Sequence, residues 1–426
     1  MKQSNIGNWA IIALVILNIV VWLVFPPVND SRPNFLRQYA GEIIGSNNII
    51  LMACSLFLST RPKWAEKFFG GLDKMYMTHR HTSTAAFLLI FAHVLTVPIT
   101  TTGWRLGNYL AVIAFTGIVT IVLITLAPRI PYLNKLTGGD YEDWKKLKRY
   151  IGIFFILGFI HSLTVDALDA KIAITWVMIF FIIGTVSYLY TEFFGRLLKQ
   201  YQPYNVAAVK HPNNSSTEVT LRAKKEPIKK HRSGQFLFVR FPSDKMLNES
   251  HPFTISSAPS EDVLRLTIKA SGNFTRDLFS HLKEGTDATI EGPYGMFNYK
   301  TGGPNQIWIA GGIGLTPFLS FVRDMDGSLA HDVDLYYTVR HPEEAIFVDE
   351  LEATDAKNPR LKVHIRYSAK DGSLRIEDII KNVDGDIRSY HVYMCGPLPM
   401  TMAFEKKFLE MGVPKENLHY EEFNFR

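Results

Sequence analysis

Cysteine is almost absent from this chain of 426 residues, which contains only Cys54 and Cys395. Two thiols cannot form a disulfide framework or a four-thiolate metal site, so any metal needs other ligands. A strong charge of one sign is also absent. The formal net charge is +6, and the basic residues cluster beside apolar runs, which argues against a nucleic-acid partner. The sequence also has no internal repeat and no low-complexity segment.

Long apolar runs are concentrated in the first half of the chain. Each has close to the ~20 residues that are needed to cross a ~30 Å hydrocarbon core. The six predicted membrane segments are 9–25, 40–58, 79–99, 109–127, 150–168 and 172–193. The first run ends at "PPVNDSRP" without a small-residue cleavage site, so we expect a retained anchor rather than a signal peptide.

The loops between these segments predict their orientation. Loops 61–74, 128–149 and 195–200 are basic, whereas "ITTTGWRLGN" and "DALDAK" carry little positive charge. Positive loops stay on the cytoplasmic side. We therefore expect a multi-pass protein of the cell membrane, in contact with lipid, with both termini and the C-terminal half in the cytoplasm.

The second half of the chain has two further patterns. From about residue 201, short β-type runs alternate with turns, which predicts an antiparallel barrel or sandwich. After residue 303, strands alternate with helices, as in a doubly wound α/β fold. The predicted domains are a transmembrane helical domain (1–199), a β-barrel domain (200–300) and an α/β domain (301–426).

Two glycine-containing turns belong to the α/β part. "IWIAGGIGLTPFL" (307–319) places a buried-type strand before glycines and a helix start, an arrangement that lets a dinucleotide pyrophosphate approach backbone amides. Such a turn alone is equally typical of a tight strand-to-helix connection. "YMCGP" (393–397) ends a later strand, and we expect it at the same carboxyl edge of the sheet, where ligands bind in such folds.

Histidines interrupt the third apolar segment in "HRHTSTAAFLLIFAH" (79–93). On an ideal helix His79 and His93 lie within ~40° of one face and ~21 Å apart along the axis. A single histidine in a membrane helix often does no more than form a hydrogen bond to a neighbouring helix. Two on one face make that reading less favourable. Haem is a candidate for the bound group, because imidazole is a usual haem ligand and haem is a one-electron carrier that can act within a membrane. His161, in the fifth segment, is a partner from another helix.

The turns "HPFTISSAP" (251–259) and "KASGNFT" (269–275), together with the two glycine turns, resemble the ferredoxin reductase-type flavoprotein module. Joined to six membrane helices, they resemble the NADPH oxidase and ferric reductase family of transmembrane flavocytochromes b, and the bacterial NADPH oxidases most. The resemblance extends from the second helix to the last residue.

The resemblance implies roles for individual residues in binding FAD and NADPH. His251, Pro252, Phe253 and Thr254 line the flavin; Lys269, Gly272 and Thr275 face the FAD pyrophosphate; Gly311, Gly312, Gly314, Thr316 and Pro317 hold the NADPH pyrophosphate; Cys395, Gly396 and Pro397 lie by the nicotinamide. Arg340 matches the position that recognises the 2′-phosphate, and the alternative for it is a solvated strand end. Phe423, in the terminal "HYEEFNFR", is the expected flavin shield, and it and Cys395 are the expected catalytic residues.

The resemblance also implies two sites for haem b. The family pairs two histidines on the third helix with two on the fifth. His93 and His161 then hold the outer iron and His79 the inner iron, but Lys148 stands where the family has the fourth histidine. Three possibilities are open. Lys148 binds the iron, it contacts a propionate or a lipid headgroup, or the chain lacks the inner haem.

The function implied is transfer of electrons from cytoplasmic NADPH through FAD and haem to dioxygen on the outer side, which forms superoxide. A ferric or cupric reductase with the same relay is the alternative. A rival of another class is a binding or transport protein whose membrane histidines serve a proton or metal path. The sequence has no obvious regulatory insertion, so we expect no obligatory regulatory subunit.

Overall fold

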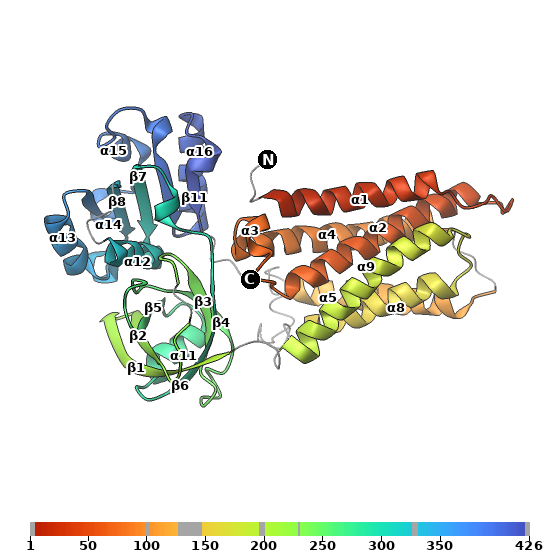
Figure 1. Ribbon diagram of the computed structural model, residues 1–426, viewed down its shortest axis with the longest axis horizontal. Coiled ribbons are helices and arrows are strands. Elements are labelled where there is room, and N and C mark those ends of the chain that lie inside the picture. Colours follow the sequence, from red (N-terminus) through yellow and green to blue (C-terminus); the bar gives the residue numbers. More distant parts are fainter. Residues whose placement is uncertain are drawn as a thin grey trace. The chain divides into compact units, whose positions relative to one another are not determined.

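The computed structural model describes residues 5–98, 103–126, 147–195, 201–228, 231–325 and 331–421 (Figure 1). The chain divides into two compact units, Met1–Lys199 and Gln200–Arg426. The first unit is helical, and the second contains two sheets with helices around them.

Among the described residues of the first unit there are six main helices, and each overlaps one of the six apolar segments predicted from the sequence. They are α1 (Ile6–Val24), α2 (Phe35–Ser59), α4 (Leu72–Thr96), α5 (Leu106–Leu126), α8 (Ile151–Thr164) and α9 (Lys171–Leu189). Shorter turns adjoin them: α3 (Glu66–Phe69), the 3₁₀ turn η3 (Lys148–Tyr150) before α8, and the π-helical turn η4 (Tyr190–Phe194) after α9.

Four of the helices in the described part of the chain are long and apolar enough to cross a membrane. They are α1, α2, α5 and the continuous stretch of α9 and η4. Helix α4 has 25 residues but also three histidines and several charges, and α8 has only 14 residues, fewer than the predicted segment 150–168. Length and composition therefore support the predicted spans for four helices and not for all six.

The bundle is apolar on its outside. Helix α2 packs against α1, α4 and α9, and α5 packs against α8. Small residues allow close approach: a Cβ at Gly152 on α8 would collide with the ring of Tyr188 on α9. Ile16, Ile182 and Val186 are exposed apolar residues on the outer helices. An unburied apolar helix surface is typical of contact with lipid.

The first sheet of the second unit is antiparallel and closes on itself. Its strands run in the order β4-β3-β6-β1-β2-β5. They are β1 (Gln202–Asn213), β2 (Ser216–Ala223), β3 (Phe236–Arg240), β4 (His251–Thr254), β5 (Leu264–Lys269) and β6 (Asp287–Tyr294). A bridge between Ile255 and Leu266 joins the β4 and β5 ends of the sheet. The predicted antiparallel barrel is therefore present, with α11 (Asn273–His281) after β5.

The second sheet is parallel, as the alternation of strands and helices predicted. Its strand order is β11-β10-β7-β8-β9. The strands are β7 (Asn305–Gly311), β8 (Asp332–Val339), β9 (Leu361–Tyr367), β10 (His391–Cys395) and β11 (Leu418–Tyr420). The helices are α12 (Thr316–Asp324), α13 (Val348–Lys357), α14 (Ser368–Asp371), α15 (Ile376–Ile380) and α16 (Leu398–Glu410).

Helices cover both faces of this sheet. Residues of α12 and α13 pack on one face in a cluster with Leu335 and Tyr337, and residues of α15 and α16 pack on the other face with Tyr336 and Val392. The chain leaves the central strand β7 toward β9 and later returns to place β10 on the other side of β7. This reversal is a topological switch point, and ligands bind at the carboxyl ends of the strands there.

Candidate redox sites

The glycine turn after β7 lies at the switch point. Gly311 ends β7, a 3₁₀ turn (Gly312–Leu315) follows, and α12 begins at Thr316. Gly312 has φ +55°, a left-handed conformation that favours glycine, and a Cβ there would meet no atom within 4 Å. The backbone is thus open on this side next to a helix start, as an anionic pyrophosphate requires.

The turn after β10 meets the turn after β7. Cys395 pairs with Ala310 across the two strands, and a Cβ on Gly314 would collide with the carbonyl of Cys395. The Cys395 side chain is fully buried. Burial raises the pKa of its thiol well above the ordinary value, and the nearby carboxylate of Glu421 raises it further. Cys395 is therefore a neutral thiol beside the nucleotide turn.

Glu421 is a residue that the sequence reasoning missed. It directly follows β11 and is only 4% exposed. A Cβ on Gly295 would lie 3.5 Å from its Oε1, so the carboxylate is held between the end of the parallel sheet and the loop after β6. The signal in the sequence was its place in "HYEEF". Phe423, the expected flavin shield, lies outside the described residues.

The predicted flavin residues form strand β4. His251, Pro252 and Phe253 pair with β3, and Thr254 is buried. The ring of His251 stacks on that of Phe274, with centroids 3.9 Å apart and planes at 29°. Phe274 belongs to α11 and was not singled out from the sequence, because only the fold places it over β4.

The predicted residues for the FAD pyrophosphate lie at the start of α11. The Thr275 hydroxyl accepts hydrogen bonds from the backbone N–H groups of Ser271 and Gly272, both at 2.9 Å. It therefore orders the turn in which Gly272 lies. The Lys269 ammonium, at the end of β5, lies 3.6 Å from the Glu344 carboxylate. A phosphate at Lys269 therefore competes with Glu344 for this cation.

Arg340 directly follows β8, at the same carboxyl edge as the two turns. Its side chain is exposed, and its backbone carbonyl accepts a hydrogen bond from the N–H of Ala369 at 3.0 Å. The carbonyl contact fixes the backbone while the guanidinium faces solvent, so the arginine can reach a ligand bound across this edge.

The helical unit brings two of the predicted haem ligands together. His93 on α4 and His161 on α8 have ring centroids 6.4 Å apart, with planes at 78°. A metal–imidazole bond is about 2.0 Å, so two rings that held one metal between them would each have a centroid ~3 Å from it and would lie ~6 Å apart. The observed separation fits one iron between the rings.

Each of the three predicted histidines is oriented by a backbone carbonyl. The Nδ1 atoms of His79, His93 and His161 lie 2.9, 2.8 and 2.9 Å from carbonyl oxygens of other helices. These carbonyls belong to Ser55, Gly41 and Gly107. A carbonyl can only accept, so Nδ1 carries the hydrogen and Nε2 keeps the lone pair that binds a metal. The three side chains therefore fit the haem expected from the sequence.

A haem would need only two ligands from the protein. In the described part of the chain, no group of three or more His, Cys, Asp or Glu side chains is placed to hold a metal ion. Gly45 on α2 makes room for the His93 ring, because a Cβ there would lie 2.9 Å from the ring's Nδ1.

Lys148 lies in the 3₁₀ turn η3 that precedes α8. In a continuous α-helix it would point ~140° away from His161. A 3₁₀ turn advances ~120° per residue, which reduces this offset to ~80° and makes the rise from Lys148 to His161 ~21 Å. The positive charge of Lys148 interacts electrostatically with His79. Lys148 and His79 are therefore close enough for their charges to interact, and the role of Lys148 at the inner site stays a prediction.

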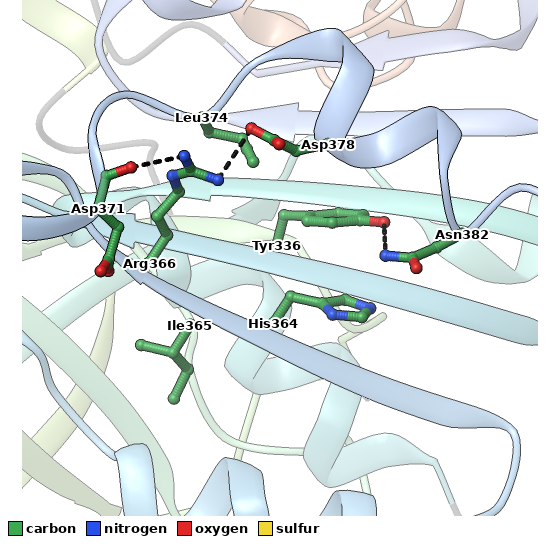
Figure 2. Close-up of a pocket in the computed structure, with 8 residues that line it drawn as sticks. All are labelled: Tyr336, His364, Ile365, Arg366, Asp371, Leu374, Asp378 and Asn382. Atoms are coloured by element: carbon green, nitrogen blue, oxygen red, sulfur yellow. Dashed lines mark hydrogen bonds and ion pairs between the residues drawn. The ribbon is translucent and has the colours of Figure 1, made fainter.

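A pocket of about 220 Å³ lies over β8 and β9, away from the glycine turns (Figure 2). Tyr336 and His364 stack in it with centroids 4.6 Å apart. Asn382 donates to the Tyr336 hydroxyl at 2.9 Å, and Arg366 contacts Asp378 at 2.8 Å. Burial raises the pKa of Tyr336 to about 12, so it stays a neutral phenol. These polar groups bind one another, which makes the pocket part of the domain's own packing.

Comparison with known families identifies both parts of the second unit. Residues 198–298 match the FAD-binding domain family, and residues 308–406 match the oxidoreductase NAD-binding domain family. The second unit is therefore a ferredoxin reductase-type FAD and pyridine-nucleotide module, as the motifs predicted.

Individual relatives agree with this assignment. The chain is 29% identical over 206 residues to the carnitine monooxygenase reductase subunit of Escherichia coli, covering 46% of this chain and 60% of the relative. It is 25% identical over 214 residues to flavohemoprotein A of Dictyostelium discoideum, covering 46% and 54%. The chain thus spans little more than half the length of these curated relatives.

One solved structure matches most of the chain in fold. The crystal structure of flavohemoglobin from Malassezia yamatoensis with bound FAD and heme has a TM-score of 0.53 at 17% identity, covering 91% of this chain and 97% of that one. At this identity the match speaks for fold alone.

Proposed function

We propose that this protein is a transmembrane oxidoreductase of the NADPH oxidase and ferric reductase type. Its second unit takes electrons from NADPH onto FAD, and its helical unit carries them through haem b to dioxygen, with superoxide as the product. The observation that carries the proposal is the pair His93 and His161, whose rings lie 6.4 Å apart in a helical bundle on the same chain as the FAD and nucleotide domains.

The residues of the second unit bind and orient the two nucleotides. The open turn at Gly312 and the start of α12 receive the NADPH pyrophosphate, and Arg340 receives the 2′-phosphate. Cys395, a neutral thiol, and the buried Glu421 border the position of the nicotinamide. FAD, when bound, accepts a hydride and releases its electrons singly.

The residues of the helical unit hold and orient haem. His93 and His161 would bind one iron and His79 would bind the other, with Lys148 as the candidate second ligand of that site. The carbonyls of Gly41, Gly107 and Ser55 keep each Nδ1 protonated and so direct Nε2 to the metal. Haem, when bound, carries one electron at a time, which a hydride donor cannot.

The proposed location is the cell membrane, with both termini and the FAD and NADPH module in the cytoplasm. It is supported by the four helices of sufficient length and apolarity, by the apolar outside of the bundle and by the basic loops expected on the inner side. Dioxygen at the outer side needs no protein base, because electron transfer to it forms no bond to the protein.

The test uses the full chain, purified in detergent and supplied with FAD and haem. We expect anaerobic NADPH to bleach the flavin and then to shift the haem Soret band. In air, cytochrome c reduction should be inhibited by superoxide dismutase. Flavin reduction without any haem absorption would contradict the transmembrane relay. Cytochrome c reduction that superoxide dismutase leaves unchanged would contradict dioxygen as the acceptor.

A further inference from the structure

Helix α12 connects the nucleotide turn to the flavin strand. It begins at Thr316, directly after the glycine turn, and ends at Asp324. Ser320, Arg323 and Asp324 follow the helical spacing of one face. Each of these three side chains is bonded to a residue of the FAD domain. The apolar side chains of the helix pack in the core of the nucleotide domain: Phe318, Leu319, Phe321 and Val322.

The bonds reach the chain just past the flavin-lining residues. The Ser320 hydroxyl donates to the carbonyl of Ser257 at 2.7 Å, and the Arg323 guanidinium donates to the carbonyl of Ser256 at 2.8 Å. Ser256 and Ser257 lie two and three residues after Thr254, the last residue of β4. Asp324 accepts a hydrogen bond from the Ser233 hydroxyl at 2.7 Å.

Arg323 has further partners besides the Ser256 carbonyl. Its Nε and one terminal nitrogen contact the two oxygens of Glu350 on α13 at 2.6 and 2.8 Å, and Glu218 on β2 lies 3.5 Å away. The side chains of Arg323 and Glu218 are only 8% and 7% exposed. The guanidinium also lies 5.1 Å from the centre of the Phe347 ring.

A planar guanidinium with bidentate partners has little freedom of orientation. Burial lowers the pKa of Arg323, but the carboxylates of Glu350 and Glu218 outweigh this and raise it. The arginine is therefore always charged, and its donors hold the Ser256 carbonyl in one position relative to α12.

We infer that Arg323 is a positioning residue that sets the distance between the flavin strand and the nucleotide turn. This inference rests on the proposed reduction of FAD by a nicotinamide nucleotide. The helix between the two sites is short, Thr316 to Val322 are buried, and its last turn is bonded to the chain that follows the flavin strand. Hydride transfer depends steeply on the approach of the two reacting atoms, and a displacement of ~1 Å costs about 100-fold in rate.

The test compares Arg323→Met with Arg360→Met in the full chain loaded with FAD. Methionine keeps the length and apolar volume of the arginine stem but has no donor. Arg360 is an exposed arginine of the same domain with one loose contact, 3.5 Å from Asp332. We measure anaerobic flavin reduction by NADPH in a single turnover, the NADPH dissociation constant, and the charge-transfer absorbance of the nucleotide–flavin complex.

For Arg323→Met we expect flavin reduction to slow by about 100-fold, with the dissociation constant within about twofold of wild type and a weaker charge-transfer band. Arg360→Met should match wild type in all three. Arg323→Lys keeps the charge but not the fork, so its rate should lie between the two. A wild-type reduction rate in folded Arg323→Met would overturn the inference.

Loss of a buried partner can also unfold a protein, and two milder variants keep the inference testable in that case. Ser320→Ala removes only the bond to Ser257, and Glu350→Gln loosens Arg323 without removing it. Both should slow hydride transfer and leave nucleotide affinity unchanged, and wild-type rates in both would overturn the inference. If wild-type protein itself is not reduced by NADPH or NADH, the proposed function fails instead, which separates the two results.

Discussion

The imidazole rings of His93 and His161 lie 6.4 Å apart, and each donates its Nδ1 hydrogen to a glycine carbonyl of another helix. Rings also pack at this separation, but here each Nδ1 is hydrogen-bonded to a carbonyl, so each Nε2 keeps its lone pair. Two neighbouring rings in this state are suited to bind one metal.

Arg340→Ala should weaken the binding of NADPH far more than the binding of NADH. One charge-assisted contact to phosphate is worth about 1.5–3 kcal/mol, so KM for NADPH should rise roughly 10- to 150-fold while KM for NADH stays near its original value. Steady-state kinetics with both nucleotides measures this, with the exposed Arg360→Ala as the matched control. Equal changes for both nucleotides would mean that Arg340 does not contact the 2′-phosphate.

Cys395 should resist alkylation in the folded protein. Its thiol is buried and its pKa is raised, so little thiolate is present at pH 8.5, where an ordinary thiol is about half ionised. Peptide mass spectrometry after iodoacetamide treatment should find Cys395 unmodified until the protein is unfolded. Labelling of the folded protein at the rate of a free thiol would contradict the assignment.

The same shift has a consequence for stability. The folded protein keeps the Cys395 proton at pH values where the unfolded chain has released it, above about 8.5. The contribution of this thiol to the free energy of unfolding is therefore complete below the pKa that the thiol has in the unfolded chain. It is lost as pH rises through the higher pKa that the thiol has in the folded protein. Wild type should lose more stability to denaturant between pH 8 and 10 than Cys395→Ala does; an identical loss in both would exclude this contribution.

Lys148→His should change the inner haem site. Histidine is the stronger ligand at neutral pH because lysine must first lose its proton. We expect a sharper low-spin spectrum, faster turnover and a haem content nearer two per FAD than in wild type. Haem quantitation and visible spectra of both proteins measure this, and Lys171→His at the exposed start of α9 is the control. Two haems per FAD with identical spectra and turnover in both proteins would mean that Lys148 does not bind the iron.

Periodicity and motifs predicted much of the fold. The six apolar segments gave the positions of six helices, and the change from short β-runs to alternating strands and helices gave the two domains of the second unit. The meeting of the Gly314 and Cys395 turns also followed from the sequence, because both end neighbouring parallel strands.

The contacts made by tertiary packing did not follow from the sequence. Arg323, Phe274 and the carbonyls of Gly41 and Gly107 carry no local signal, since their importance arises only when distant elements pack together. The 3₁₀ turn at Lys148 was also missed, because an ideal α-helix was assumed there and the tighter turn rotates this side chain by ~60°.

The central claim is that His93 and His161 bind one haem. The most direct measurement is the low-temperature EPR and visible spectrum of His93→Ala and His161→Ala, with His81→Ala, an exposed histidine on the same helix α4, as the control. We predict that each of the first two variants loses the same low-spin haem signal while NADPH still reduces the flavin, and that His81→Ala matches wild type. Retention of every haem signal in both variants would contradict the claim.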